Sequence, residues 1–294
     1  MIQNLLTAAA PLMLASLGAL FTELAGTLGV FIEGFMTLGS FFAWIIAART
    51  GSVFWGCGIT ALCAALAGWA LARFVRCTGA NPFITGLALN LAAGGITDSL
   101  STAWFGTKGV LRNPGMTLPG PLHFPLIEGI PVVGTILSGR SPFVYTAWAC
   151  TLIGAFIIGR TRLGLRLRAT GLSPAAAAER GIHPEWYREG AWAIAALLAA
   201  LAGAALTFRV GAYTPGGVAG RGWIALAAVY LGFRRVWGSA AAALVFTLAE
   251  HIGLGLQGLG ALPATALLGI PSALALVLYT LSHCVGKKRS LTGR

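Results

Sequence analysis

Charged residues are scarce in this chain. They make up 10% of its 294 residues, and only 8 of them are Asp or Glu. Soluble domains carry about a quarter charged residues, and a soluble globule of this length has too much surface to cover with so few. Apolar residues reach 57%, and 41 glycines come in addition. This composition excludes a soluble enzyme, a disordered chain, collagen and a small disulfide-rich fold, and it predicts a polytopic membrane protein.

Several chemical signatures are missing as well. No Gly-x-x-x-x-Gly-Lys-Ser/Thr motif occurs, so nothing predicts ATP binding through a P-loop. Neither His-x-x-x-His, His-Glu-x-x-His nor Gly-x-Ser-x-Gly appears, so we expect no metal site and no catalytic residue. The five cysteines are scattered, which favours free buried thiols. If ATP drives this protein, another subunit must bind ATP and magnesium.

Long apolar segments run along the whole chain, and most are close to the 20 residues that a helix needs to cross a bilayer. We count nine, at residues 5–22, 28–48, 53–72, 82–105, 142–159, 191–209, 222–233, 236–256 and 263–283. The segment 222–233 is too short to cross alone and begins among glycines, as half of a broken helix does. The prediction is a single all-α transmembrane domain over residues 1–294, with about nine helices and at least one broken or re-entrant segment.

Basic residues predict the orientation. The net charge is +12, which in a soluble protein would point to nucleic acid, but here Lys and Arg flank the apolar segments and act as topology signals toward membrane lipid. If the C-terminal tail is cytoplasmic, 14 of the 20 Lys and Arg residues lie inside and six outside. This split places the Pro-rich loop 106–141 outside and the Arg-rich loop 160–190 in the cytoplasm.

The inner loop contains a short predicted helix. Ser173 is a suitable N-cap, Pro174 suits the first helical position, and Gly181 can end the helix. A helix of about two turns is marginal in water by itself. It therefore needs either the membrane surface or a partner protein to hold it.

A few polar residues interrupt the apolar segments. Glu33, Asp98 and Glu250 fall within or near them, and a carboxylate at a helix centre costs roughly 2.5–3.5 kcal/mol on insertion scales. Each must face a cavity or lock two helices by a hydrogen bond, and the second role is favoured slightly for Glu33 and Glu250. Thr97 and Asp98 follow Asn90 by seven and eight residues, which predicts a polar stripe along nearly one helical face. We expect this stripe to line a pathway with Gly220, Gly222 and Trp223.

Two pairs of segments look alike within the chain. Residues 76–82 resemble residues 168–174, and residues 34–39 resemble residues 222–227. Internal repeats are common in transporters, but these matches are short enough to arise by chance.

Four motifs, in order, resemble those of a known permease family. They are residues 31–43, residues 81–90, residues 164–171 with 174–177, and residues 220–228. Together they are similar to the membrane permeases of ATP-binding-cassette (ABC) importers for branched-chain amino acids, sugars and nucleosides. The segment Gly-Arg-Gly-Trp-Ile-Ala-Leu-Ala-Ala most resembles the nucleoside-type branch and the riboflavin permeases.

The resemblance implies a multi-pass permease of the bacterial inner membrane with no cofactor of its own. Its implied partners are ATP-binding cassette subunits, a second permease chain and an extracytoplasmic substrate-binding lipoprotein facing loop 106–141. It also implies that the inner helix docks the ATP-binding subunit as a coupling helix, comprising Ser173, Pro174, Ala176, Glu179 and Gly181. The alternative is an ion- or proton-coupled secondary transporter that uses Asp98 or Glu33 as its ion site.

Overall fold

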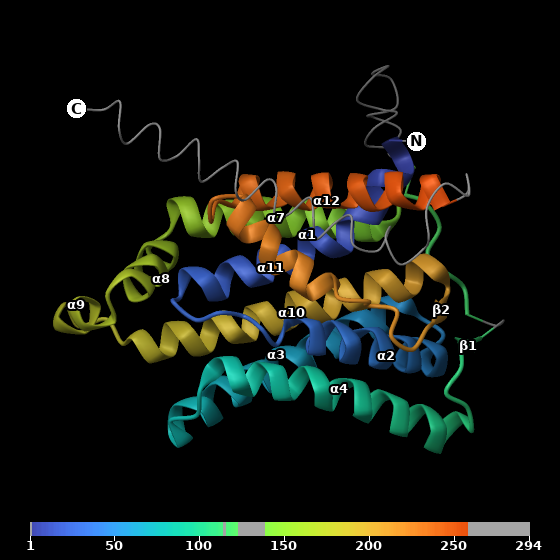
Figure 1. The fold of residues 1–294 in the computed structure, drawn as a ribbon, viewed down its shortest axis with the longest axis horizontal. Helices are drawn as coiled ribbons and strands as arrows, with labels where there is room; N and C mark the ends of the chain where they lie inside the picture. The colour runs from blue at the N-terminus through green and yellow to red at the C-terminus, as the bar shows by residue number, and fades with distance from the viewer. Residues whose placement is uncertain (1, 114–115, 123–138, 258–294) are drawn as a thin grey trace.

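A computed structural model describes residues 2–113, 116–122 and 139–257 of the chain as an elongated helical bundle (Figure 1). The described helices are α1 (Ile2–Leu24), α2 (Ile32–Thr50), α3 (Val53–Thr78), α4 (Pro82–Phe105), α7 (Pro142–Arg160), α8 (Arg162–Leu172), α9 (Pro174–Glu179), α10 (Pro184–Val210), α11 (Arg221–Leu231) and α12 (Val236–Gln257). The all-α prediction is confirmed, apart from one sheet of two very short strands.

Seven of the described helices are long and apolar enough to cross a membrane. With the shorter α11, they match eight of the nine predicted segments, and the ninth, residues 263–283, lies outside the described residues. In Figure 1 the long helices lie along the long axis, with α8 and α9 at one end and the two strands at the other. Long helices make their backbone hydrogen bonds internally, as the spanning segments of a multi-pass membrane protein must.

Helix α10 forms the centre of the bundle, and its Ala- and Gly-rich sequence allows close packing. It packs against α1, α2 and α3, and most of its residues from Ala195 to Phe208 are buried. A Cβ atom added at Gly203 would overlap the carbonyl of Met36, and one at Gly39 would overlap the backbone of Ala200. Small residues are therefore needed where α2 crosses α10, because the two backbones approach one another directly.

The predicted inner loop is more helical than expected. Helix α10 begins at Pro184, about two turns before the expected residue 191, and α8 occupies residues 162–172. The missed turns are rich in polar and charged residues, such as Glu185 and Arg188, so they do not register as part of an apolar segment. A helix can extend beyond the apolar slab because its backbone hydrogen bonds are made internally. The cytoplasmic assignment of loop 160–190 stays a prediction, with the first turns of α10 inside it.

A small sheet joins two loops at the end of the molecule opposite α9. Strand β1 (Leu111–Arg112) pairs antiparallel with β2 (Ala212–Tyr213), with Leu111 opposite Tyr213. Tyr213 is buried against Phe41, and burial raises the pKa of its hydroxyl above the ordinary value. The described part of loop 106–141 is thus anchored directly to the segment that precedes α11.

The internal similarities mark helix boundaries. Asn81 caps α4 by accepting a hydrogen bond from the Phe83 N–H, and Pro82 begins that helix. Ser173 caps α9 in the same way, with Pro174 in the first helical position. The similarity of residues 76–82 and 168–174 therefore reflects a shared stop-and-restart pattern of helices.

The cysteines differ in part from their prediction. The four described cysteines are free, as expected, but Cys63 and Cys77 are exposed on the surface of the bundle and only Cys57 and Cys150 are partly buried. Exposed apolar and thiol side chains are tolerated on a helix whose outer face meets lipid.

Candidate functional site

Helix α11 is a short helix entered through a tight return of the chain. In Figure 1 the chain leaves β2 at one end and passes back along the molecule before α11 begins. Residues 214–220 make this return with positive φ angles at Gly216, Ala219 and Gly220. The 11 residues of α11 span about 16 Å at 1.5 Å per residue, roughly half of the 30 Å apolar core of a bilayer. The prediction of a half-helix at residues 222–233 is confirmed in its length and place.

The first turn of α11 is held by a carboxylate from α2. One oxygen of Glu33 accepts a hydrogen bond from the Gly220 N–H at 2.8 Å, and the other accepts from the Gly222 N–H at 2.6 Å. A Cβ atom at Gly222 would lie 2.6 Å from the Glu33 backbone nitrogen. Because free N–H groups at a helix start carry partial positive charge, a carboxylate is well suited to satisfy them away from water. Glycine at position 222 allows the two segments to meet.

The first turn of α2 is held in a related way by α4. The side-chain oxygen of Asn90 accepts from the Gly34 N–H at 2.7 Å, and its amide nitrogen donates to the Val30 carbonyl at 2.8 Å. The equivalent glycines of the two similar segments, Gly34 and Gly222, thus both donate to a side chain of a neighbouring helix. Residue Asn90 satisfies two backbone groups that the irregular entry to α2 leaves without helical partners.

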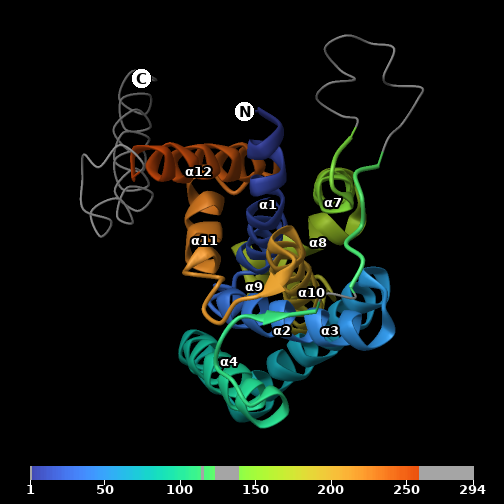
Figure 2. The same cartoon turned by 90° about the vertical axis from the view of Figure 1, so that its right-hand side faces the viewer.

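An ion pair connects α11 to α12. Arg221 pairs with Glu250 and also donates to the Gly217 carbonyl at 3.0 Å. Four helices, α4, α2, α11 and α12, are therefore linked in series by polar side chains at the starts of α2 and α11. We call the set Asn90, Glu33, Gly220, Gly222 and Arg221 the junction. Figure 2 shows α2 between α4 on one side and α11 on the other.

Beside the junction lies a cavity of about 340 Å³. It is bounded by α2, α10 and the return before α11, and its polar lining includes Ser40, Thr207, Arg209, Thr214 and Arg221. Non-helical backbone at membrane depth is tolerated where it lines such a space. The cavity faces the end of the molecule that carries β2, which is the outer end in the predicted orientation.

The predicted stripe on α4 does not form one surface. Thr97 is buried and donates to the Ala93 carbonyl, whereas Asp98 is exposed. Consecutive helical residues point about 100° apart, so the expectation of a single face for Asn90, Thr97 and Asp98 was wrong. Asn90 and Thr97 lie on the packed face of α4, and Asp98 lies on its free face.

The three carboxylates of the apolar segments have different surroundings. Glu33 and Glu250 lock helices together, the role that sequence reasoning favoured for them. Asp98 has no such packed environment. Which face of α4 stays exposed is a tertiary property, which spacing along one helix does not reveal.

The aromatic residues of α2 and α11 differ in exposure: Tyr230 is 38% exposed, whereas Phe35 is buried. Trp223 is 43% exposed in the first turn of α11. Phe35 is buried against Phe31, and the Tyr230 hydroxyl donates to Glu23. Trp223 therefore presents a free ring beside the junction, while Phe35 is part of the core.

The short inner helix is present as α9. The Ser173 hydroxyl accepts from the Ala176 N–H at 3.4 Å, Pro174 begins the helix and Glu179 ends it, with Gly181 following in the left-handed region. Residues 173–181 are all exposed except Ala177, which is buried. In Figure 1 α9 projects beyond the long helices at one end of the molecule.

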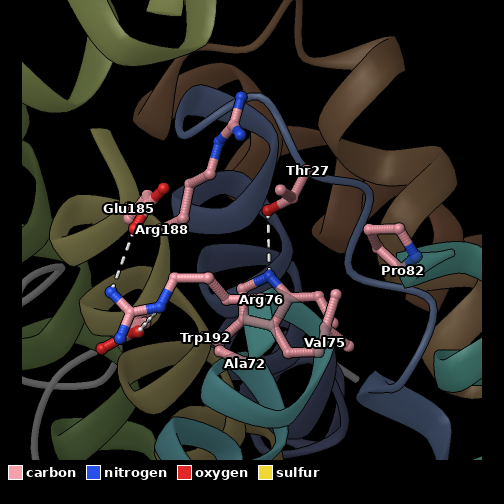
Figure 3. Close-up of a pocket in the computed structure, with 9 residues that line it drawn as sticks. Thr27, Ala72, Val75, Arg76, Pro82, Glu185, Arg188 and Trp192 are labelled. Atoms are coloured by element: carbon pink, nitrogen blue, oxygen red, sulfur yellow. Dashed lines mark hydrogen bonds and ion pairs between the residues drawn. The ribbon is translucent and has the colours of Figure 1, made fainter. Parts of the chain in front are cut away.

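A cluster at the base of α10 was missed by sequence reasoning. Arg76 at the end of α3 pairs with Glu185 and with the buried Glu189, each at 3.1 Å, around a cavity of about 160 Å³ (Figure 3). The Trp192 indole donates to the Thr27 hydroxyl at 3.0 Å, across the same cavity. Hydropathy alone assigned this part of the chain to a loop, so the helical face that carries these residues was not recognised. The cluster connects α10, which follows α9, to the segment that leads into α2.

Comparison with known proteins agrees with this architecture. Residues 1–281 match the model of the family described as branched-chain amino acid transport system / permease component. The nucleoside ABC transporter permease protein NupC of Lactococcus lactis subsp. cremoris is 26% identical, over 95% of this chain and 91% of that protein. The guanosine ABC transporter permease protein NupQ of Bacillus subtilis is 31% identical, over 84% and 79%.

A third relative is named for glucose and not for a nucleoside. The putative glucose ABC transporter permease protein TsgC13 of Haloferax volcanii is 30% identical, over 86% of this chain and 76% of its own length. No solved structure matches the chain.

The chain belongs to this family of permease components. It is a multi-pass permease subunit of an ABC importer in the bacterial inner membrane, and its relatives are transport subunits. The resemblance stated from the four motifs is confirmed, and the alternative of a secondary transporter is not supported. None of these three relatives is named for riboflavin, so that substrate stays a prediction.

Proposed function

We propose that this permease carries nucleosides inward, driven by ATP that a partner subunit binds and hydrolyses with magnesium. The observation that carries the proposal is the junction: two helices begin within the bundle, beside a cavity, in a chain whose relatives include permeases named for nucleosides and guanosine. In this proposal the chain supplies the passage, and the chemistry of ATP hydrolysis belongs to the partner subunit.

The chemistry of the junction suits a neutral, hydrogen-bonding solute. Asn90, Thr97, Asp98, Gly220, Gly222 and Trp223 stay our predicted pathway residues, with the difference that Asn90 and Thr97 shape the wall while Asp98 and Trp223 are the accessible members. The Trp223 ring can stack on a planar base. Ser40, Thr207 and Thr214 line the cavity beside the junction, and their hydroxyl groups can exchange hydrogen bonds with a sugar without binding it tightly.

Helix α9 is the proposed coupling helix. Its docking on an ATP-binding cassette subunit would place the force of ATP-driven closure on α8 and on the base of α10. From there the Trp192–Thr27 hydrogen bond and the Arg188–Ala25 contact at 3.3 Å lead to the segment before α2. Glu33 then joins α2 to α11, so a displacement at α9 has a continuous packed route to the junction.

Two further partners complete the proposed importer. A second permease chain would enclose the passage against the free faces of α4 and α11. A substrate-binding lipoprotein would meet the end of the molecule that carries β1, β2 and loop 106–141. Substrate selection would rest largely with that receptor.

Uptake of radiolabelled guanosine by cells that express the permease with its ATP-binding subunit and receptor tests the proposal. We expect uptake to stop when the catalytic glutamate of the ATP-binding subunit is replaced, and to survive a protonophore while ATP is maintained. Uptake that needs the proton gradient and ignores the ATPase variant would support secondary transport instead. Uptake of glucose but not guanosine would retain the importer and overturn the nucleoside assignment.

A further inference from the structure

An apolar groove opens on the bundle near the α8 end of the molecule. It has a volume of about 340 Å³ and lies between α1, α7, α8 and α10. Its walls are almost entirely apolar, formed by Phe21, Ile157, Leu163, Leu167, Trp186, Tyr187, Ala191 and Ile194 with Gly164 and Gly190. The groove is separate from the junction and from the cavity beside it, since no residue lines both.

The rim of the groove is basic. Arg166 donates to the Tyr187 hydroxyl at 3.2 Å, so its guanidinium lies at the edge of the groove. Arg162 precedes it by one helical turn, and Arg160 follows the groove-lining Ile157 by three residues at the end of α7. In the described part of the chain these three arginines form no ion pair.

Nearby acids are already engaged elsewhere. Glu185 and Glu189 pair with Arg76 on the other side of α10, and Glu23 pairs with Arg234. The rim therefore carries a local excess of positive charge next to an apolar slot.

The depth of the groove matches the inner membrane interface. It lies where the apolar helices α1 and α7 end and the polar helix α8 begins. Trp186 is 69% exposed and Tyr187 half-buried at this level, and such aromatic residues concentrate at membrane interfaces. Basic pockets between spanning helices on the cytoplasmic side bind anionic lipid head groups.

We infer that this groove binds an anionic glycerophospholipid of the cytoplasmic leaflet. An acyl chain fills the apolar slot between α1, α7 and α10, and the phosphate contacts the guanidinium groups of Arg162 and Arg166. The bound lipid stabilises the angle between α7 and α8, and thereby the position of α9. The inference does not depend on which solute the permease carries.

Native mass spectrometry of the purified full chain, exchanged into detergent with phosphatidylglycerol or phosphatidylcholine, tests this site. We expect phosphatidylglycerol to be retained more strongly than phosphatidylcholine. Replacing both arginines by glutamine (Arg162→Gln with Arg166→Gln) lowers the affinity for phosphatidylglycerol by about fivefold per arginine. Both side chains are exposed, so the double variant leaves the core unchanged.

A second variant tests the apolar slot. Gly190 lines the groove, and a Cβ atom there meets no other atom within 4 Å. We expect the side chain of Gly190→Leu to occupy the groove and to reduce retention of both lipids. Arg235→Gln, an exposed arginine on the same side of the membrane, and Gly159→Leu, also without a neighbour at its Cβ position, are the matched controls. Neither control should change lipid retention.

Three outcomes would overturn the inference. They are equal retention of the two lipids, an equal loss in the Arg235→Gln control, and displacement of the bound mass by inorganic phosphate alone. The last result would mean that the arginines hold a free anion and that the apolar groove contributes nothing.

Discussion

At the scale of single residues, the most consequential side chain is Glu33. It satisfies two N–H groups of a helix that begins inside the bundle, where water is scarce and an unsatisfied donor is costly. Asn90 does the same for α2 with a neutral amide. These residues hold backbone segments in position, so replacing them should lower the stability of the protein and, as a consequence, its rate of transport.

Glu33→Ala should lower the thermal stability of the purified protein in detergent. It leaves the N–H groups of Gly220 and Gly222 without acceptors, at a cost of about 1–3 kcal/mol each. Glu33→Gln retains one acceptor oxygen and should lose less. A thermal unfolding curve measures both, and equal midpoints for the alanine variant and the wild type would contradict the role of Glu33 as a cap.

Asp98→Asn should leave folding and assembly with the ATP-binding subunit intact, because Asp98 is exposed on the free face of α4. If that face lines the passage, the rate of substrate uptake should change. A cysteine at position 98 should also be protected from a thiol reagent by substrate, in a chain without its native cysteines. Unchanged uptake and no protection would remove Asp98 from the pathway.

At the scale of helices, close contact between backbones determines where glycine is required. The crossing of α2 and α10 has no space for side chains at Gly39 and Gly203. Other glycines, such as Gly159, have open surroundings. The same residue type therefore serves a packing role at one position and none at another.

Gly203→Ala should destabilise the bundle by about 1–3 kcal/mol, since the added methyl group forces α2 and α10 apart. Gly159→Ala is the matched control and should be neutral or stabilising by up to about 1 kcal/mol, because alanine favours the helix. Unfolding of both variants in detergent under identical conditions measures the difference. A control that falls as far as Gly203→Ala would argue against the specific crossing.

Helix α9 can be broken without touching the core. Ala178 is exposed in its last turn, and proline there costs about 3 kcal/mol in helix stability. Ala178→Pro should abolish co-purification of the ATP-binding subunit and uptake together, while Ala178→Ser retains both. Normal assembly of the proline variant would show that α9 is a membrane-surface helix and not the docking element.

At the scale of the whole molecule, the two ends of the bundle differ in charge and in structure. The α8–α9 end carries most of the described arginines, and the opposite end carries the small sheet and the cavity beside the junction. This polarity agrees with the positive-inside rule. The orientation of the bundle in the membrane is therefore open to a direct test.

A cysteine at position 180, in a chain without its native cysteines, should be shielded from an impermeant thiol reagent in intact cells. It should become reactive once the membrane is permeabilised. A cysteine at position 108, at the opposite end after α4, should react in intact cells and is the control. Labelling of position 180 from outside would reverse the predicted topology.

Some features follow from the amino-acid sequence alone. Low charge and long apolar segments determine a multi-pass helical protein, since only helices and closed barrels satisfy their backbone within lipid. Ser173 with Pro174, and Asn81 with Pro82, determine where α9 and α4 begin, because capping depends on neighbours in the chain. The short glycine-flanked segment 222–233 likewise predicted α11.

Tertiary structure decided which residues meet. Glu33 and Gly222 are 189 positions apart, and no local pattern reports such a contact. Thr97 is buried and Asp98 is exposed because α2 covers only one face of α4. Helix α10 extends to Pro184 because its polar first turns pair with α3. Local chemistry thus determined the elements, whereas the packing of distant segments determined the junction, the cavities and the side of each helix that remains free.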